Sequence, residues 1–143
     1  MHHYERLDNR IRVFSNKLNC GCSQTFENAL SYVNGEYIAF CDQDDVWRPD
    51  KLSIMIDILK NESIGLVYSN CDVIDEESNI KIDNYREINN LVGIDSSHEN
   101  INEICWFNSF ILGCSIVIKF DVLSKVLPIL DNSHNHDKWI VSL

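Results

Sequence analysis

The stretch GEYIAFCDQDDVWRPDKL (residues 35–52) joins an apolar run at 37–41 to three carboxylates that follow it directly, Asp42, Asp44 and Asp45. A continuous apolar run of this length is typical of a strand covered on both faces, as in a parallel sheet. The carboxylates therefore stand at the carboxyl end of a buried strand, where open α/β sheets bind their ligands.

Apolar residues at helical spacing lie on both sides of this strand. Upstream, behind a Ser23 N-cap, the positions i, i+3, i+4 and i+7 are Phe26, Ala29, Leu30 and Val33. Downstream, Pro49 suits the first turn of a helix with the stripe Leu52, Met55, Ile56 and Leu59. With strand-like runs at 11–14 and 65–69, the alternation predicts an α/β fold. We expect a mostly parallel sheet with flanking helices, in which 11–14, 37–41 and 65–69 are neighbours.

The second half of the chain is less regular. The segment 76–102 is polar and weakly periodic. Further elements are predicted as follows: strands at 80–82 and 114–119, and helices at 101–107, from Asp121 and from about His136. Because 143 residues suit one hydrophobic core, we expect a single domain over residues 1–143.

Charge and cysteine content exclude several classes of site. The chain has 12 basic and 22 acidic residues, so we expect no nucleic-acid partner, which would require clustered Lys and Arg. A phosphate ligand stays compatible, because a bound divalent cation reverses the local field. The six cysteines lack the spacing of a zinc site, and we expect reduced thiols. With no apolar run near the roughly 18 residues that span a bilayer, and no signal-peptide pattern, we expect a cytoplasmic protein.

The acidic cluster has two interpretations on its residues alone. Three carboxylates within four residues repel one another, and a hard cation with oxygen ligands relieves that repulsion most simply. Mg²⁺ or Mn²⁺ fits, since either ion takes one or two carboxylates and leaves positions for phosphate oxygens. The alternative is a solvated turn that caps the helix after Pro49.

Residues 35–52 resemble the central block of family-two glycosyltransferases with the GT-A fold, and are most similar to the rhamnosyltransferase-like branch. The resemblance continues at these positions: Asn19, Gly21, Ser23, Phe26, Tyr68-Ser69, Asp72, Gly113-Cys114-Ser115 and His136-Asp137-Lys138-Trp139. A lone Asp-x-Asp would be weak, but this set follows the family's order over most of the chain. The resemblance implies a partial GT-A, Rossmann-like fold.

The resemblance also implies roles for individual residues. Asp42 and Asp44 match the Asp-x-Asp motif, so Asp44 would ligate the metal, and Asp42 would contact the donor nucleotide or the metal shell. Asp45 would bind the donor through a water. Asp137 matches the general base that acts on the acceptor hydroxyl, although an aspartate there would equally suit a helix N-cap. The positions implied in acceptor or sugar binding are Trp47, Gly113, Cys114, His136 and Trp139; the two tryptophans also fit a core.

The implied reaction is inverting, metal-dependent transfer of a sugar from a nucleotide-sugar donor to a saccharide or lipid-linked acceptor, in bacterial surface polysaccharide synthesis. Its implied place is the cytoplasm or the inner face of the membrane. We expect the chain to enter the family fold partway, without the N-terminal donor-binding section, and with Phe26 where many relatives outside this branch carry Arg. We therefore expect weak transfer by the isolated chain, and self-association through exposed sheet edges.

Two other functions compete with this interpretation. A strand followed by Asp42-x-Asp44-x-Val46 also matches the nucleophile motif of haloacid-dehalogenase-like phosphohydrolases, in which Asp42 would attack phosphorus. That motif usually opens its fold, whereas an α/β unit precedes it here. A non-enzymatic remnant, which keeps an acceptor half but cannot hold a donor, is the second alternative.

Overall fold

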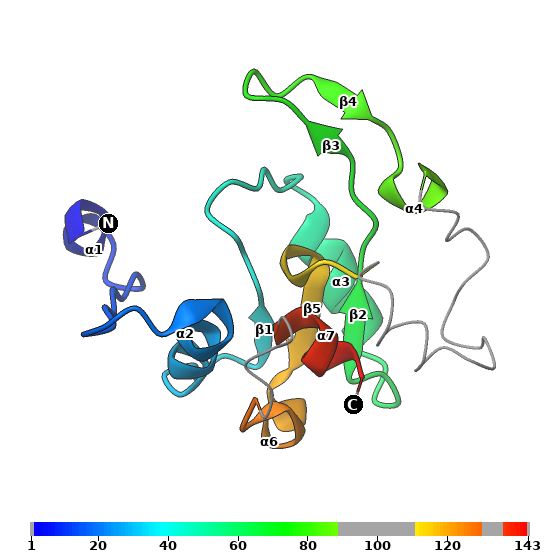
Figure 1. Cartoon of the computed structure of the whole chain (residues 1–143). Coiled ribbons are helices and arrows are strands. Elements are labelled where there is room, and N and C mark those ends of the chain that lie inside the picture. The colour runs from blue at the N-terminus through cyan, green and yellow to red at the C-terminus, as the bar shows by residue number, and fades with distance from the viewer. Residues whose placement is uncertain (1, 89–110, 130–135, 143) are drawn as a thin grey trace.

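The computed structural model describes residues 2–88, 111–129 and 136–142 (Figure 1). The helices and strands of these residues are α1 (His2–Leu7), α2 (Gly21–Leu30), β1 (Tyr37–Ala39), α3 (Lys51–Leu59), β2 (Leu66–Tyr68), β3 (Val73–Ile74), β4 (Ile80–Ile82), α4 (Tyr85–Ile88), the 3-10 turn η1 (Gly113–Ser115), β5 (Ile116–Lys119), the 3-10 turn η2 (Phe120–Val122), α6 (Leu123–Val126) and α7 (His136–Val141). The α/β class predicted from the sequence is confirmed.

The main sheet differs from the predicted one in strand order and direction. Its order is β1-β5-β2, and both strand pairs are antiparallel, so the predicted mostly parallel sheet is not confirmed. The predicted pairing of 37–41 with 65–69 is wrong because β5 lies between them. The predicted burial of this run on both faces is also wrong, because Ile38 and Phe40 are buried whereas Ala39 and Cys41 are exposed. This alternation is typical of an antiparallel strand.

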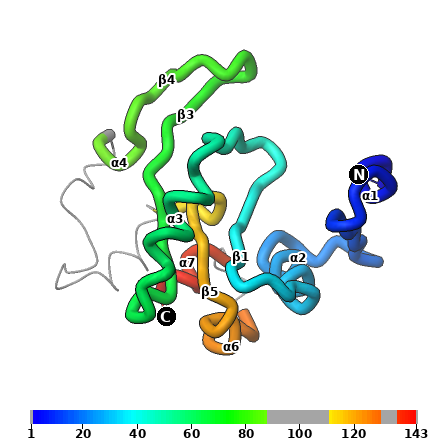
Figure 2. The backbone as a smooth tube through the Cα atoms, turned by 180° about the vertical axis from the view of Figure 1, so that it is seen from behind, coloured from blue at the N-terminus to red at the C-terminus, as the bar shows by residue number. Residues whose placement is uncertain are grey.

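Helices cover both faces of this sheet. On one face, Ile38 of β1 and two residues of β5, Ile116 and Ile118, pack with Leu30, Val126 and Ile140, which come from α2, α6 and α7. On the other face, Val117 packs against Met55 and Leu59 of α3. Figure 1 shows α7 in front of the sheet with α3 behind it, and Figure 2 shows the same layers from the back. The alternation along β5 therefore divides the core into two layers.

Several boundaries depart from those predicted. The first long helix starts at Gly21, two residues before the predicted N-cap Ser23, and α3 begins two residues after Pro49. The predicted strand at 11–14 is wrong, since these residues adopt no regular structure. The sequence patterns also missed the short elements α1, β3 and α4. The helix predicted at 101–107 lies outside the described residues.

The remaining elements extend away from the sheet. The hairpin β3-β4 and the short α4 project from one end of the molecule, and α1 lies apart from the sheet (Figure 1). Among the described residues, no helix has both the length and the apolar character needed to cross a membrane. The five described cysteines are free thiols, as predicted for them.

Candidate active site

Three chain segments meet at one end of the strands of the main sheet. The strands β1 and β2 end there, and β5 begins there because it is antiparallel to both. The Phe40 amide donates to the Ile116 carbonyl (3.3 Å), and the Ser69 amide donates to the Ser115 carbonyl (3.1 Å). The antiparallel strand thereby brings η1 beside the acidic loop that follows β1.

The acidic loop and η1 together form a cluster of metal-binding groups. Oxygens of Asp42 and Asp45 and the Cys114 sulfur all lie within 4.8 Å of one another. Among the described residues, this is the one group of three or more His, Cys, Asp or Glu side chains close enough to hold a metal ion. Asp42 is half-buried, whereas Asp45 and Asp44 are exposed. The structure thus brings together two of the three predicted carboxylates and places Asp44 outside the cluster.

The electrostatics of the cluster reflect burial and crowded negative charge. Burial raises the pKa of Asp42, and the neighbouring carboxylates of Asp45, Asp44 and Asp137 raise it further, against an opposing effect of His136. Burial raises the pKa of Cys114 to about 12, assisted by the hydrogen bond that its thiol donates to the Asp45 carboxylate. The site therefore concentrates carboxylates that favour a proton or a cation beside them.

Lys51 supplies a positive charge next to this cluster. Its ammonium donates a hydrogen bond to the Cys114 carbonyl (2.5 Å) and lies 4.0 Å from the centre of the Trp47 ring. Burial lowers the pKa of Lys51, although Cys114 and Asp45 act in the opposite direction. The first residue of α3 thus ties the acidic loop to η1.

Asp137, the predicted base, lies on α7, near Gly113 of η1. Its side chain is buried, with 8% exposed, and one carboxylate oxygen accepts a hydrogen bond from the Lys138 amide (2.8 Å). A Cβ atom on Gly113 would lie 3.6 Å from the Asp137 Cβ, and Gly113 directly precedes Cys114 of the acidic cluster. The two predicted carboxylate sites therefore converge on one region.

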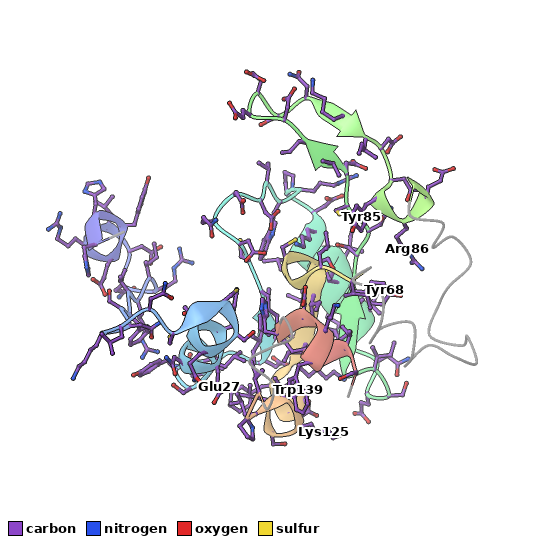
Figure 3. All side chains as sticks on the ribbon, viewed as in Figure 1. Glu27, Tyr68, Tyr85, Arg86, Lys125 and Trp139 are labelled. Carbon is purple, nitrogen blue, oxygen red and sulfur yellow. The ribbon has the colours of Figure 1, made fainter. Side chains whose placement is uncertain are left out.

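The residues predicted to bind sugar have other contacts in this structure. His136 is buried against Gly113, with its ring stacked on Phe26. The Trp139 indole N–H donates to the Val126 carbonyl (2.8 Å), which ties α7 to α6 (Figure 3). Lys51 covers one face of Trp47. Sugar stacking on these tryptophans remains a prediction.

Sequence reasoning missed the roles of Lys51 and Cys22. Both stand inside the segments that carry the family resemblance, but no periodicity distinguishes a lysine that bridges two loops from a solvated one. Cys22 lies 3.9 Å from His136 through its sulfur, a contact between residues 114 positions apart. Only the folded chain brings these two residues together.

The chain matches known glycosyltransferases along most of its length. Residues 1–127 match the family described as Glycosyl transferase family 2. An Escherichia coli protein named UDP-Glc:alpha-D-GlcNAc-diphosphoundecaprenol beta-1,3-glucosyltransferase WfgD is 34% identical over 74 residues, which cover 52% of this chain and 29% of that protein. A Bacillus subtilis protein named putative teichuronic acid biosynthesis glycosyltransferase TuaG is 33% identical, over 46% of this chain and 26% of that protein.

The match with a third relative extends further along this chain. An uncharacterised glycosyltransferase of Rickettsia conorii is 27% identical over 91% of this chain and 22% of that protein. The chain thus spans between 22% and 29% of the length of these three relatives. No solved structure gives a significant match. With its family match over residues 1–127 and the acidic motif at the end of β1, the chain belongs to glycosyl transferase family 2.

Proposed function

We propose that this chain takes part in inverting transfer of a sugar from a nucleotide-sugar donor to a saccharide or lipid-linked acceptor, with the acidic cluster as donor site and Asp137 as base. The observation that carries the proposal is the position of the cluster. Carboxylates that match the family's Asp-x-Asp motif begin three residues after the end of β1. Asp137 lies beside Gly113, the residue before Cys114 of the cluster. Neither the family nor its named relatives favour the phosphohydrolase alternative.

The donor set of the cluster suits a hard divalent cation. Asp42 and Asp45 offer carboxylate oxygens within 4.8 Å of each other, and Asp44 lies between them in the sequence. Mg²⁺ and Mn²⁺ prefer such oxygens, whereas the Cys114 sulfur is occupied as a hydrogen-bond donor to Asp45. We propose Asp42 and Asp44 as ligands, with Asp45 as a third carboxylate. A bound ion would neutralise the charge that builds on the leaving nucleoside diphosphate.

The protein groups do the rest of the chemistry. Asp137 would accept the proton of the acceptor hydroxyl as its oxygen attacks the sugar, on the face opposite the leaving group. Lys51 bonds to the Cys114 carbonyl of η1 and thereby holds η1 beside the acidic loop. This contact would fix the distance between the donor site and Asp137. Such positioning is a large part of catalysis, since orientation contributes roughly 7–11 kcal/mol of a barrier.

The relatives suggest a class of substrate. The Escherichia coli relative is named for transfer of glucose from UDP-Glc to a GlcNAc-diphosphoundecaprenol, and the Bacillus subtilis relative for teichuronic acid synthesis. We propose that this chain likewise serves bacterial surface polysaccharide synthesis, with a lipid-linked saccharide as acceptor. An acceptor of this kind would place the protein at the inner face of the membrane.

Single-turnover transfer tests this proposal. The purified chain is incubated with radiolabelled UDP-glucose, a GlcNAc-diphospholipid acceptor and Mn²⁺, a format that detects slow transfer. We expect labelled product, its loss after EDTA, and its return with Mn²⁺ or Mg²⁺. If no sugar is transferred from a panel of nucleotide sugars, the remnant alternative is supported. Release of phosphate from an aryl phosphate would instead support the phosphohydrolase.

A further inference from the structure

We propose that His136 is a positioning residue that holds Asp137 in register with the acidic cluster, and that residue 113 is glycine because the His136 imidazole occupies the space of a side chain. The inference rests on the proposed function, in which Asp137 is the base. It assigns His136 a task different from the sugar contact predicted from the sequence.

The imidazole is fixed by packing on several sides. Only 5% of His136 is exposed. Its ring stacks on Phe26 of α2 with a centroid distance of 3.9 Å and an interplanar angle of 22°, and lies 5.9 Å from the Phe40 ring. The Phe26 and Phe40 rings are themselves 5.9 Å apart, so the three rings form one packed cluster. A buried ring in such a cluster has little rotational freedom, so the backbone that follows it is held as well.

Gly113 closes the remaining side of the ring. A Cβ atom on this glycine would lie 2.8 Å from His136 Nε2 and 3.3 Å from Cε1, and 3.6 Å from the Asp137 Cβ. The first distance is shorter than non-bonded atoms tolerate. The imidazole therefore fills the volume that a side chain at position 113 would need. An alanine here would push on His136, which has Phe26 on another side.

The ring nitrogens differ in their surroundings, which indicates the tautomer. Among the described residues Nε2 is buried without a hydrogen-bond partner, whereas Nδ1 lies 3.9 Å from the Cys22 sulfur. A buried N–H without a partner is rarer than a buried lone pair without one. Burial also lowers the pKa of His136, which favours the neutral ring. We therefore assign the proton to Nδ1, which donates to Cys22, and the lone pair to Nε2.

The contact between Gly113 and His136 connects the proposed base with the proposed donor site. Gly113 touches His136 on α7, and the next residue, Cys114, bonds to Asp45 in the acidic loop. The turn η1 is therefore a spacer between the base and the donor site. A neutral imidazole also places no positive charge beside the carboxylate that must accept a proton.

A matched pair of glycine variants tests the positioning role. Gly113→Ala and Gly65→Ala both introduce a Cβ at 2.8 Å from a side-chain atom, but Gly65 meets Val122, away from the acidic cluster. We expect Gly113→Ala to lower kcat by roughly 100-fold with the donor KM within about twofold, and Gly65→Ala to leave kcat unchanged. The double variant Gly113→Ala/His136→Ala should regain thermal stability but not kcat. Equal kcat losses in both single variants would overturn the proposal.

A second measurement does not depend on transfer. Long-range ¹H–¹⁵N correlation spectra of the wild-type chain report which nitrogen of each histidine carries the proton. We expect the Nδ1–H tautomer at His136 near neutral pH, and its loss in Cys22→Ala. An Nε2–H tautomer or a charged ring would overturn the proposed role of His136, even if the chain transfers sugar. A chain that shows the expected tautomer but transfers no sugar would count against the proposed function alone.

Discussion

Asp137→Asn is expected to reduce sugar transfer by roughly 10²- to 10⁴-fold, the contribution typical of a general base. The reason is that an amide cannot accept the proton of the acceptor hydroxyl. We expect Mn²⁺ and donor binding to persist, because Asp137 is not a member of the carboxylate and thiol cluster. The measurement compares kcat and donor affinity of the variant with those of the unsubstituted chain.

The same variant separates catalysis from folding. The asparagine side chain keeps an oxygen that can accept the Lys138 amide, the bond that Asp137 makes in the structure. The thermal midpoint should therefore change little. Asp57→Asn is the matched control, since Asp57 is an exposed residue of α3 that pairs with Lys60. Transfer at the wild-type rate in Asp137→Asn would refute the base assignment.

Asp42→Asn is expected to abolish Mn²⁺ binding and transfer while making the metal-free protein more stable. The first effect follows from loss of the half-buried ligand in the cluster. The second follows from the raised pKa of Asp42, because burial and neighbouring carboxylates disfavour its charge in the folded state. A group whose pKa is raised on folding destabilises the fold as pH rises above its usual range. Because solvent screens part of the repulsion, the gain at neutral pH should be at most on the order of 1 kcal/mol.

Calorimetric Mn²⁺ titration and thermal unfolding without metal check both effects. Asp44→Asn and Asp45→Asn form a matched set with this variant, and both should weaken Mn²⁺ binding. Unchanged binding in Asp44→Asn would oppose the motif assignment, and unchanged binding in Asp45→Asn would oppose the grouping seen in the structure. A destabilised metal-free Asp42→Asn would contradict the account of charge repulsion.

The local parts of the fold were accessible from the sequence. The stripe Leu52, Met55, Ile56 and Leu59 predicted α3, and the apolar runs predicted β1, β2 and β5. These signals are local, because helical and strand periodicities depend on which side chains face a core. For the same reason, the acidic loop could be placed correctly at the end of β1.

The long-range parts were not accessible in this way. Nothing in the run 114–119 indicates that it inserts between β1 and β2, although this insertion carries η1 to the acidic loop. The contact of Gly113 with His136 joins a turn and a helix through space alone. Phe26, which departs from the arginine of other branches, proved to be the ring on which His136 stacks. Pairing and side-chain contacts of this kind depend on the whole fold.

Metal-linked binding of a nucleoside diphosphate tests the central claim most directly. Titration calorimetry of the chain with UDP, GDP and dTDP is carried out with Mn²⁺ and again with EDTA, for the wild type and for Asp42→Asn. The account predicts that at least one nucleotide binds the wild type at least about tenfold more tightly with Mn²⁺, a coupling of about 1.4 kcal/mol. It also predicts no such coupling in Asp42→Asn. Nucleotide binding that is independent of Mn²⁺, or coupling that survives in Asp42→Asn, would contradict the acidic loop as the donor and metal site.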